Sequence, residues 1–434
     1  MTLGLVAGWS CAVCGAHVDI AEPMVWRCPK ATDSDRHHAL QMVQAIAPLR
    51  GGDDPNPFVA FQRYLAWDSF ATANGMTDEA RIATLRKVDA DVAAFAGVGM
   101  HETPFARADE LSEALGFTTD GGVWVKDETG QVGGSHKARH LMTILLHVLT
   151  AESLGIAPWA SVAERPPLAI ASCGNAAFAA GLLARAVDWP LRVFVPPHAD
   201  PAVLSGLRDL RAEIVECPRR EGDPAGDPCM HRFREAVAGG AIPFTVQGTE
   251  NAWCLDGGRT IGWEMARQFE ENVVGPPLDR LYVQVGAGTF AACVAAGIRM
   301  GAAMPMLHAV QTESCAPLRR AWENAAGLGG PTVAASHWSE CMWPWEHVGG
   351  SAADGILDDE TYDWIPVLRA MDGGGSPIVV GETHVEEANK MARKTTGVNA
   401  SHTGTAGLAG LMATIDEIDP SERVAVVFSG VSRS

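Results

Sequence analysis

The residues whose types and spacing most directly suggest a catalytic site lie between Lys126 and His140, in the run Lys-Asp-Glu-Thr-Gly-Gln-Val-Gly-Gly-Ser-His-Lys-Ala-Arg-His. A short apolar run at 123–125 predicts a strand before the turn, and the helix-prone run 138–146 predicts a helix after it. Lys137 is therefore expected at a helix N-terminus, where free N–H groups and the helix dipole lower the pKa of an ammonium group and attract anions. Such a lysine is suited to forming an imine with a carbonyl compound. The alternative is a surface lysine that ends a turn.

Lysine is scarce in this chain, which narrows the choice of an imine-forming residue. The 434 residues include six lysines, which are Lys30, Lys87, Lys126, Lys137, Lys390 and Lys394. Most of the others stand beside charged residues in segments that we expect to be solvated. Lys137 alone is embedded among glycines, a serine and an apolar helix, so it is the preferred candidate.

A second group of polar residues, Ser172-Cys-Gly-Asn175, follows the apolar run 168–171. This is the carboxyl end of a predicted strand, where open α/β sheets bind ligands. The N–H groups and the hydroxyl of the turn would hold a carboxylate, and Asn175 would donate to a phenolic oxygen. Cys173 has an alternative role as a nucleophile, but no base motif accompanies it and a small buried thiol is the commoner case.

Gly286-Ala-Gly-Thr289 has the features of a phosphate-binding turn between a strand and a helix. Glycines let backbone N–H groups approach phosphate oxygens, the threonine adds a hydroxyl, and the helix dipole adds positive potential. It is not the dinucleotide fingerprint, because position 291 is alanine where a third glycine would be needed.

These turns must be positioned by an alternation of short apolar runs and helix-prone segments between 168 and 246. Strands are expected at 168–171, 192–195, 213–217 and 244–246, and helices at 176–186, 200–210 and 231–238. This alternation predicts βαβ units and a parallel sheet in a small domain inserted into a larger one. The predicted domains are a cysteine-bearing segment at 1–45, a large domain formed by 46–150 and 255–434, and a small domain at 151–254.

Further elements are expected outside the small domain. These are helices and loops over 35–100, a helix at 106–115, strands at 281–285, 307–311 and 424–428, and a tryptophan-rich loop over a site at 338–345.

The N-terminal segment carries Cys11-Ala-Val-Cys14 and then Cys28. A Cys-x-x-Cys pair followed by another cysteine is typical of half a zinc ribbon. The last thiol of a second pair would stand at residue 31, which is alanine, and no regular spacing selects His17, His37 or His38 as a fourth ligand. The sequence therefore favours an unmetallated knuckle over bound zinc at Cys11, Cys14 and Cys28.

Composition narrows the partners and the compartment. A net charge of −19 argues against a nucleic acid or an anionic membrane as partner. No apolar run is long enough to span a membrane, and the first residues lack the basic and apolar regions of a secretory signal. Ten cysteines in a chain of this length do not form a dense disulfide framework, so a reducing cytoplasm is expected.

Five motifs then occur in one order along the chain. They are Gly-Ser-His-Lys137-Ala-Arg, Ser172-Cys-Gly-Asn-Ala176, Asp256-Gly-Gly-Arg-Thr-Ile-Gly-Trp-Glu264, Gly286-Ala-Gly-Thr289 and Phe-Ser429-Gly. From about residue 100 onward this order resembles the fold-type II pyridoxal-phosphate enzymes, the group of threonine synthase, serine/threonine dehydratases and tryptophan synthase β. The resemblance implies an α/β fold of two parallel-sheet domains with pyridoxal 5′-phosphate in the cleft between them, and a homodimer.

The resemblance also implies roles for the residues of these motifs. Lys137 would carry the cofactor and would remove the Cα proton of the substrate. Asn175 would contact the cofactor's 3′-oxygen, and Ser429 would face its pyridine nitrogen. The phosphate would be bound by Gly286, Ala287, Gly288 and Thr289. The substrate would be bound by Ser172, Cys173, Gly174, Asn175 and Ala176, and Ser135 would assist near the phosphate or only cap the helix.

A hydroxyl at the pyridine nitrogen makes the ring a weaker electron sink than a carboxylate would, which disfavours transamination. The expected activity is therefore α,β-elimination from an amino acid with a β- or γ-leaving group, as in a dehydratase, on a scaffold that resembles threonine synthase. The alternatives are threonine synthase or another replacement synthase, an amino-acid racemase, and a cofactor-binding protein without catalysis.

Overall fold

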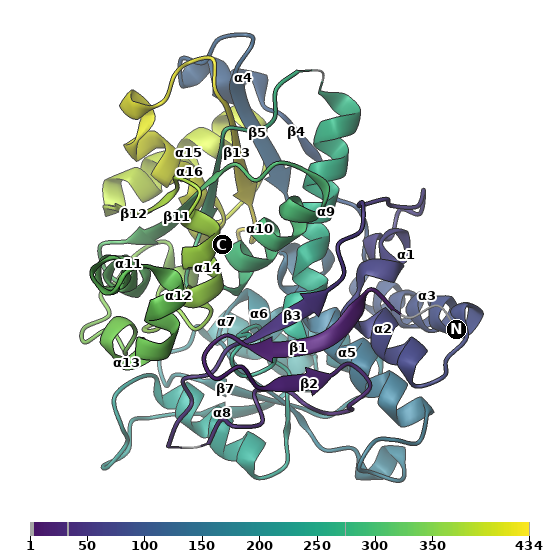
Figure 1. Ribbon diagram of the computed structural model, residues 1–434. Helices are drawn as coiled ribbons and strands as arrows, with labels where there is room; N and C mark the ends of the chain where they lie inside the picture. The colour runs from purple at the N-terminus through teal and green to yellow at the C-terminus, as the bar shows by residue number, and fades with distance from the viewer. Residues whose placement is uncertain (1–3, 33, 274, 434) are drawn as a thin grey trace.

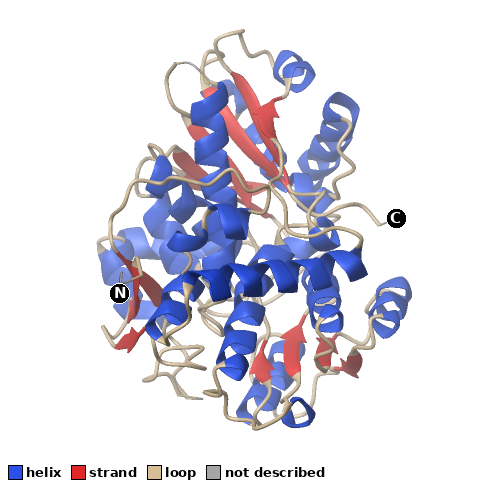
Figure 2. Cartoon of the chain, turned by 90° about the vertical axis from the view of Figure 1, so that its right-hand side faces the viewer, coloured by secondary structure: helices blue, strands red, loops and turns tan. Residues whose placement is uncertain are grey.

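The computed structural model describes residues 4–32, 34–273 and 275–433, and their strands form three sheets. In Figure 1 the larger sheet lies in the upper half, and the short N-terminal sheet lies in front of the lower half. Figure 2 shows strands above and below a central band of helices and a further group of strands beside it, near the N-terminus. This is the mixed α/β fold with parallel sheets that the sequence predicts.

The larger sheet has six strands in the order β12-β11-β10-β13-β5-β4. All neighbours pair in parallel except β4, which is antiparallel to β5. The inner strands are apolar on both faces because helices cover both faces of the sheet. The bounds are β12 (Ser376–Val380), β11 (Met306–Thr312), β10 (Arg280–Gln284), β13 (Arg423–Phe428), β5 (Gly122–Asp127) and β4 (Phe105–Arg107).

The second parallel sheet has four strands in the order β8-β7-β6-β9. Their bounds are β8 (Glu213–Glu216), β7 (Leu191–Val195), β6 (Leu168–Ala171) and β9 (Ile242–Pro243). The strand predicted at 244–246 thus lies two residues earlier, and the chain leaves the sheet after the N–H of Phe244 donates to the carbonyl of Ala169 at 2.8 Å. All four strands fall within the predicted small domain, whose boundaries stay a prediction.

Helices α5 (Lys137–Ser153), α9 (Cys254–Asn272) and α10 (Thr289–Gly301) pack closely together, with α9 in contact with both of the others. Glycines permit this approach. A Cβ on Gly257 would lie 1.9 Å from the carbonyl oxygen of Arg139, and one on Gly262 would lie 2.3 Å from that of Val294. The glycines of the Asp256–Glu264 motif therefore serve helix packing.

The other helices connect the strands or cover the sheets (Figure 1). They are α1 (Pro57–Ala60), α2 (Ala66–Ala73), α3 (Asp78–Ala96), α4 (Asp109–Ala114), α6 (Asn175–Ala186), α7 (Pro201–Asp209), α8 (Pro228–Ala238), α11 (Pro317–Leu328), α12 (Pro331–Ala334), α13 (Trp338–Cys341), α14 (Trp364–Met371), α15 (Glu382–Thr396) and α16 (His402–Ala413). The helix predicted at 106–115 is shorter, because its first residues belong to edge strand β4.

The third sheet is N-terminal and antiparallel, with the order β2-β1-β3. Its strands are β1 (Val6–Cys11), β2 (His17–Asp19) and β3 (Leu40–Gln44). The last was predicted as helix or loop, and it is a strand because β1 offers it a pairing edge. Trp9 of β1 packs edge-on against Trp253, with ring centroids 5.5 Å apart, so this sheet is fastened to the start of α9.

Across the described ranges, every helix is too short or too polar to cross a lipid bilayer.

Candidate active site

A cavity of about 290 Å³ lies at the carboxyl ends of strands from both parallel sheets. The larger sheet supplies the loops after β5, β10 and β13, and the smaller sheet supplies the loops after β6 and β7. Every residue that the sequence predicts for the cofactor or the substrate lines this cavity. These residues are Ser135, Lys137, Ser172, Cys173, Gly174, Asn175, Ala176, Gly286, Ala287, Gly288, Thr289 and Ser429. Their individual roles stay predictions.

Lys137 is the first residue of α5, as predicted, and it is partly buried at the cavity wall. Burial lowers the pKa of its ammonium group, and the opposite effect of Asp358 and Cys254 is smaller. Desolvation therefore lowers the pKa of Lys137, the effect that the sequence analysis attributed to the helix N-terminus. A lysine with a lowered pKa can lose its proton and act as a nucleophile or a base.

The turn Ser172–Ala176 links β6 to α6 and faces the cavity. The Ser172 hydroxyl oxygen accepts from the N–H of Gly174 at 3.2 Å, which shapes the turn. The side-chain oxygen of Asn175 accepts from Arg433, so its amide nitrogen remains as a donor. Burial, together with Asp354 and Asp227, raises the pKa of the Cys173 thiol. The side chain of Cys173 is exposed, whereas the sequence favoured a small buried thiol, but a neutral thiol is a poor nucleophile in either setting.

The turn Gly286–Thr289 links β10 to α10 and opens onto the same cavity. Gly288 has a φ of 91°, in the left-handed region that side chains disfavour. A Cβ there would also lie 2.8 Å from Cγ2 of Thr361. The glycine is needed for the backbone to present its N–H groups toward the cavity, as a phosphate site requires.

Two acidic side chains that the sequence reasoning missed contact this turn. The backbone of Ala287 hydrogen-bonds the carboxylate of Asp358, so the turn already serves an oxyanion. The hydroxyl of Thr289 donates to Asp363, which also accepts from the N–H of Gly248 at 2.8 Å. A turn that donates to carboxylate oxygens fits a phosphate group equally well.

Burial perturbs both of these carboxyl groups. It raises the pKa of Asp358 to about 7, against the lowering effect of Lys137, and it raises that of Asp363 to about 6. Both belong to the acidic segment 358–363, for which a solvated loop is the ordinary expectation. The tryptophan-rich stretch 338–345 was the predicted cover of the site, but among the described residues it contributes none to the cavity wall, where 354–358 lie instead.

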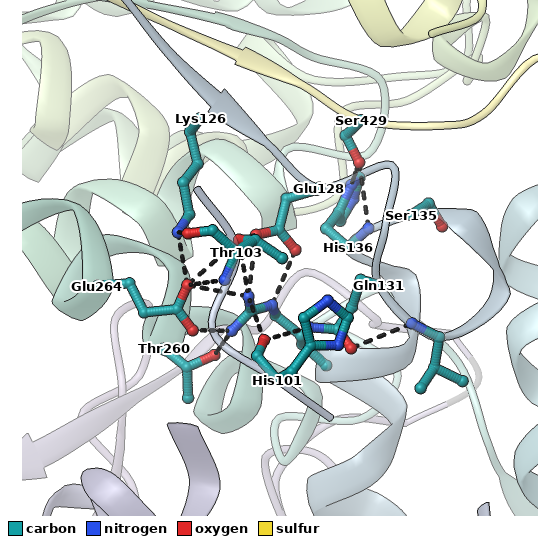
Figure 3. A network of polar contacts seen from close by, with 12 residues as sticks. His101, Thr103, Lys126, Glu128, Gln131, Ser135, His136, Thr260, Glu264 and Ser429 are labelled. Carbon is teal, nitrogen blue, oxygen red and sulfur yellow. Dashed lines mark hydrogen bonds and ion pairs between the residues drawn. The ribbon is translucent and has the colours of Figure 1, made fainter. Parts of the chain in front are cut away.

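Ser429, at the end of β13, faces His136, the residue before Lys137 (Figure 3). The hydroxyl oxygen of Ser429 accepts from the backbone N–H of His136 at 3.1 Å and pairs with its Nδ1. The His136 ring stacks on Phe290, with ring centroids 3.8 Å apart. Burial, followed by the charge of Lys137, holds the pKa of His136 well below its usual range, so the ring is neutral. His136 thus belongs to the site wall, which sequence reasoning did not assign to it.

A fully buried ion network lies near His136 and includes Lys126, in contrast to the solvated surroundings expected for most of the other lysines (Figure 3). Lys126 and Arg139 both pair with Glu264, and Arg139 also pairs with Glu128 at 2.8 Å. The hydroxyl of Thr103 donates to Glu128. Burial lowers the pKa of Lys126, and the charge of Glu264 opposes that shift. Its Nζ donates to Glu264 and to the carbonyl oxygen of Thr103, so this lysine is engaged in the network and does not compete with Lys137 as a free amine.

The N-terminal cysteines also come together, away from the cavity. Ligand atoms of Cys11, Cys14, Cys28 and His38 lie within 4.8 Å of one another. In the part of the chain that the structure describes, His17 and His37 are not members of this group. The spacing in the sequence did not select a fourth ligand, and in the structure the fourth member of the group is His38.

Comparison with known proteins adds a family match and a fold match. Residues 98–430 match the family described as "Pyridoxal-phosphate dependent enzyme". Solved structures with a similar fold include maize serine racemase, which is 17% identical, covers 81% of this chain and 94% of its own, and has a TM-score of 0.57. Processed threonine deaminase isoform 2 of Solanum lycopersicum is 17% identical, with 83% and 92% covered and a TM-score of 0.59. L-serine ammonia-lyase of Rhizomucor miehei is 17% identical, with 76% and 94% covered and a TM-score of 0.56. No curated protein sequence matches the chain.

Proposed function

Because this chain belongs to the fold-type II pyridoxal-phosphate dependent enzymes, we propose that it is a lyase that eliminates a β- or γ-leaving group from an amino acid. The observation that carries this proposal is the pairing of two groups in one cavity. Lys137 has a lowered pKa and can accept a proton, and Asp358 has a raised pKa and can donate one. An elimination needs a base at Cα and an acid at the leaving group.

The cofactor supplies the electron sink that makes the Cα proton of an amino acid removable. Lys137 would hold the cofactor through its side-chain amine, and the same amine would take the Cα proton of the substrate. Gly286, Ala287, Gly288 and Thr289 hold the phosphate with their N–H groups and a hydroxyl. Asn175 would donate to the 3′-oxygen of the cofactor, and Ser429, which pairs with His136, would lie at its ring nitrogen.

The substrate carboxylate is held by the turn that starts at Ser172. Its backbone N–H groups and the Ser172 hydroxyl present donors at the start of α6, where the helix dipole also favours an anion. Cys173 and Ala176 line the same wall. The neutral thiol of Cys173 serves as a packing surface for the substrate, without a covalent role.

Asp358 donates a proton to the departing oxygen of a hydroxyl leaving group. Hydroxide is a poor leaving group, and a positioned acid with a pKa near the working pH is the usual remedy. Burial keeps part of the Asp358 population protonated at neutral pH. Ser135, which is buried in the cavity wall, assists near the phosphate.

A racemase is the second candidate, because the same Asp358 would serve as the second acid–base group that such an enzyme requires. The solved structures with a fold similar to that of this chain include one described as serine racemase. A replacement reaction of the threonine synthase kind needs a second phosphate site, and no observation favours one. The cytoplasmic location and the homodimer that the sequence predicts remain predictions.

The test is a substrate screen with the cofactor-loaded enzyme. L-serine, L-threonine, and their O-acetyl and O-phospho esters are incubated without an added nucleophile, and keto acid and ammonia are measured. We expect equimolar keto acid and ammonia from at least one of them. Lys137→Ala should abolish this release together with the visible absorption band of the lysine-bound cofactor.

Two outcomes separate the alternatives. Appearance of the D-amino acid with deuterium from solvent at Cα, and without keto acid, would establish the racemase. If the enzyme carries out replacement when a nucleophile is added, and releases keto acid only when that nucleophile is left out, elimination is a side reaction of a replacement enzyme.

A further inference from the structure

The first two residues of the N-terminal cysteine cluster, Cys11 and Cys14, are arranged by a tight turn at the end of β1. Cys11 is the last residue of that strand, and the N–H of Gly15 donates back to its carbonyl oxygen at 3.0 Å. Gly15 has a φ of 67°, a conformation that glycine adopts without strain. This turn places the thiols of Cys11 and Cys14 on the same side of the chain.

The remaining two members arrive from distant positions. Cys28 lies in the loop after β2, and His38 lies just before β3. The sulfur atoms of Cys14 and Cys28 are 3.6 Å apart, and the sulfur of Cys11 is 3.4 Å from Nδ1 of His38. With Zn–S near 2.3 Å and Zn–N near 2.0–2.1 Å, a tetrahedral zinc site has S···S edges of about 3.8 Å and S···N edges of about 3.6 Å. The observed spacings are close to these edges.

The surroundings of the cluster also suit a metal. Nε2 of His38 lies 3.6 Å from a carboxylate oxygen of Asp35, which leaves Nδ1 to face the sulfurs. A carboxylate behind a ligating histidine is the usual outer partner at zinc sites.

We propose that Cys11, Cys14, Cys28 and His38 bind one zinc ion in a closed structural site. Four protein ligands complete a tetrahedron, so no position is left for a substrate. Cys11, Cys28 and His38 are 3%, 2% and 7% exposed, which shields the ion from solvent. On binding, each thiol releases its proton to solvent, so the occupied site has three thiolates and a neutral imidazole. This proposal does not depend on the proposed function.

A disulfide between Cys14 and Cys28 is the competing use of these thiols. It would leave Cys11 and His38 in the cluster without a partner. The convergence of three sulfurs and a ring nitrogen from four sequence positions is explained by a metal and not by a two-thiol bond.

A zinc ion at this site would hold the loop that carries Cys28 against the segment before α9. The loop that carries Cys28 accepts two hydrogen bonds from the segment before α9: Trp253 Nε1 donates to the carbonyl of Val25 at 3.0 Å, and the N–H of Ala252 donates to that of Trp26 at 2.8 Å. The hydroxyl of Thr143, on helix α5 that begins at Lys137, donates to the carbonyl oxygen of Trp253 at 2.8 Å. Bound zinc would therefore stabilise the segment before α9, which packs behind the cavity, without contacting the cavity itself.

The test starts with the wild-type holoenzyme, purified under reducing conditions and exposed to zinc followed by gel filtration. Elemental analysis should give equimolar zinc and protein. Replacement by cobalt should give the intense visible bands of a tetrahedral thiolate site. Chelation should lower the melting temperature, and added zinc should restore it.

Matched variants locate the ion. Cys14→Ser and His38→Ala should lose stoichiometric zinc, while Cys341→Ser, which removes a buried thiol outside the cluster, should retain it. The wild-type measurement is decisive even if a ligand variant fails to fold. Folded, reduced wild-type protein that holds only traces of zinc would overturn the proposal, as would a peptide mass that shows Cys14 joined to Cys28 or equimolar content of a different metal.

Discussion

At Asp358 two opposing effects act on one carboxyl group. Burial raises its pKa, the charge of Lys137 lowers it, and the balance is about 7. The group is protonated below this pH and is a carboxylate above it. The same atoms contact the backbone of Ala287, so this residue touches both the acid–base chemistry and the phosphate turn that we propose.

The first prediction concerns the pH profile of elimination from a hydroxyl substrate. Because only protonated Asp358 donates, kcat for the wild type should fall as the pH rises through about 7. Asp358→Asn should remove this limb and lower kcat by about 100-fold or more, the scale of general acid catalysis. Keto acid release measured from pH 5 to about 9 tests this.

An O-acetyl substrate provides the control, because acetate leaves without protonation. With it, Asp358→Asn should lose far less activity. An equal loss with both substrates would show that Asp358 does not act as the acid for the leaving group.

A second prediction at the residue scale concerns Gly288. Gly288→Ala should weaken cofactor binding by about tenfold, since an alanine is strained at a φ of 91° and its Cβ would crowd Thr361. Gly327→Ala is the matched control, because Gly327 lies in α11 with open space around it, and the change should leave binding unaltered and the helix slightly more stable. Cofactor titration followed by absorbance measures both, and unchanged affinity in Gly288→Ala would contradict the phosphate assignment.

At the scale of elements, the position of Lys137 depends on how α5 is held. Arg139 lies one half-turn beyond the lysine and joins α5 to α9 through Glu264, while Lys126 joins β5 to the same carboxylate (Figure 3). Burial alone would raise the pKa of Glu264, but Arg139 and Lys126 hold it at about 2. The network thus fixes the start of α5 against the strand and the helix beside it.

Removing one charge should therefore destabilise the protein. Glu264→Gln leaves two buried cations without their shared partner, and we expect it to lower the free energy of unfolding by about 3–5 kcal/mol. Since the pKa of Glu264 is depressed in the folded state, its contribution is present above pH 4.5 and is lost as the pH falls toward 2. Urea unfolding at several pH values measures both effects.

The matched control is Glu323→Gln, which removes the carboxylate of an exposed pair with Arg319 on α11. It should change stability by less than about 1 kcal/mol. A Glu264→Gln variant as stable as this control would show that the network does not fix α5.

At the scale of the whole molecule, the cavity exists because two sheets meet at their carboxyl ends. The carboxylate of Asp363 links the two sheets. It accepts hydrogen bonds from the hydroxyl of Thr289, at the start of α10, and from the N–H of Gly248, just beyond the smaller sheet. One carboxylate therefore ties the phosphate turn to the other half of the fold.

The fourth prediction is that Asp363→Ala weakens cofactor binding by roughly 10- to 100-fold, the equivalent of a lost hydrogen bond to a charged group. At saturating cofactor the visible band should still form, because Lys137 is untouched. Asp363→Asn, which keeps an acceptor oxygen, should lose less. Normal affinity in Asp363→Ala would show that the turn is held without this link.

The sequence alone determined the features that depend on neighbours along the chain. A glycine-rich turn before a helix-prone run placed Lys137 at the start of α5, and apolar runs followed by polar turns located the Ser172 and Gly286 segments at strand ends. The order of these motifs identified the family to which the chain belongs.

Only the tertiary structure decided the roles of polar residues whose partners are distant. Lys126 meets Glu264 across 138 positions, and His38 meets Cys11 across 27. Asp358 stands in a run of acidic residues typical of a solvated loop, and its raised pKa comes from burial against the cavity. Desolvation and ion pairing act through space, so a charged side chain can be assigned to solvent, core or site only when the chain around it has folded.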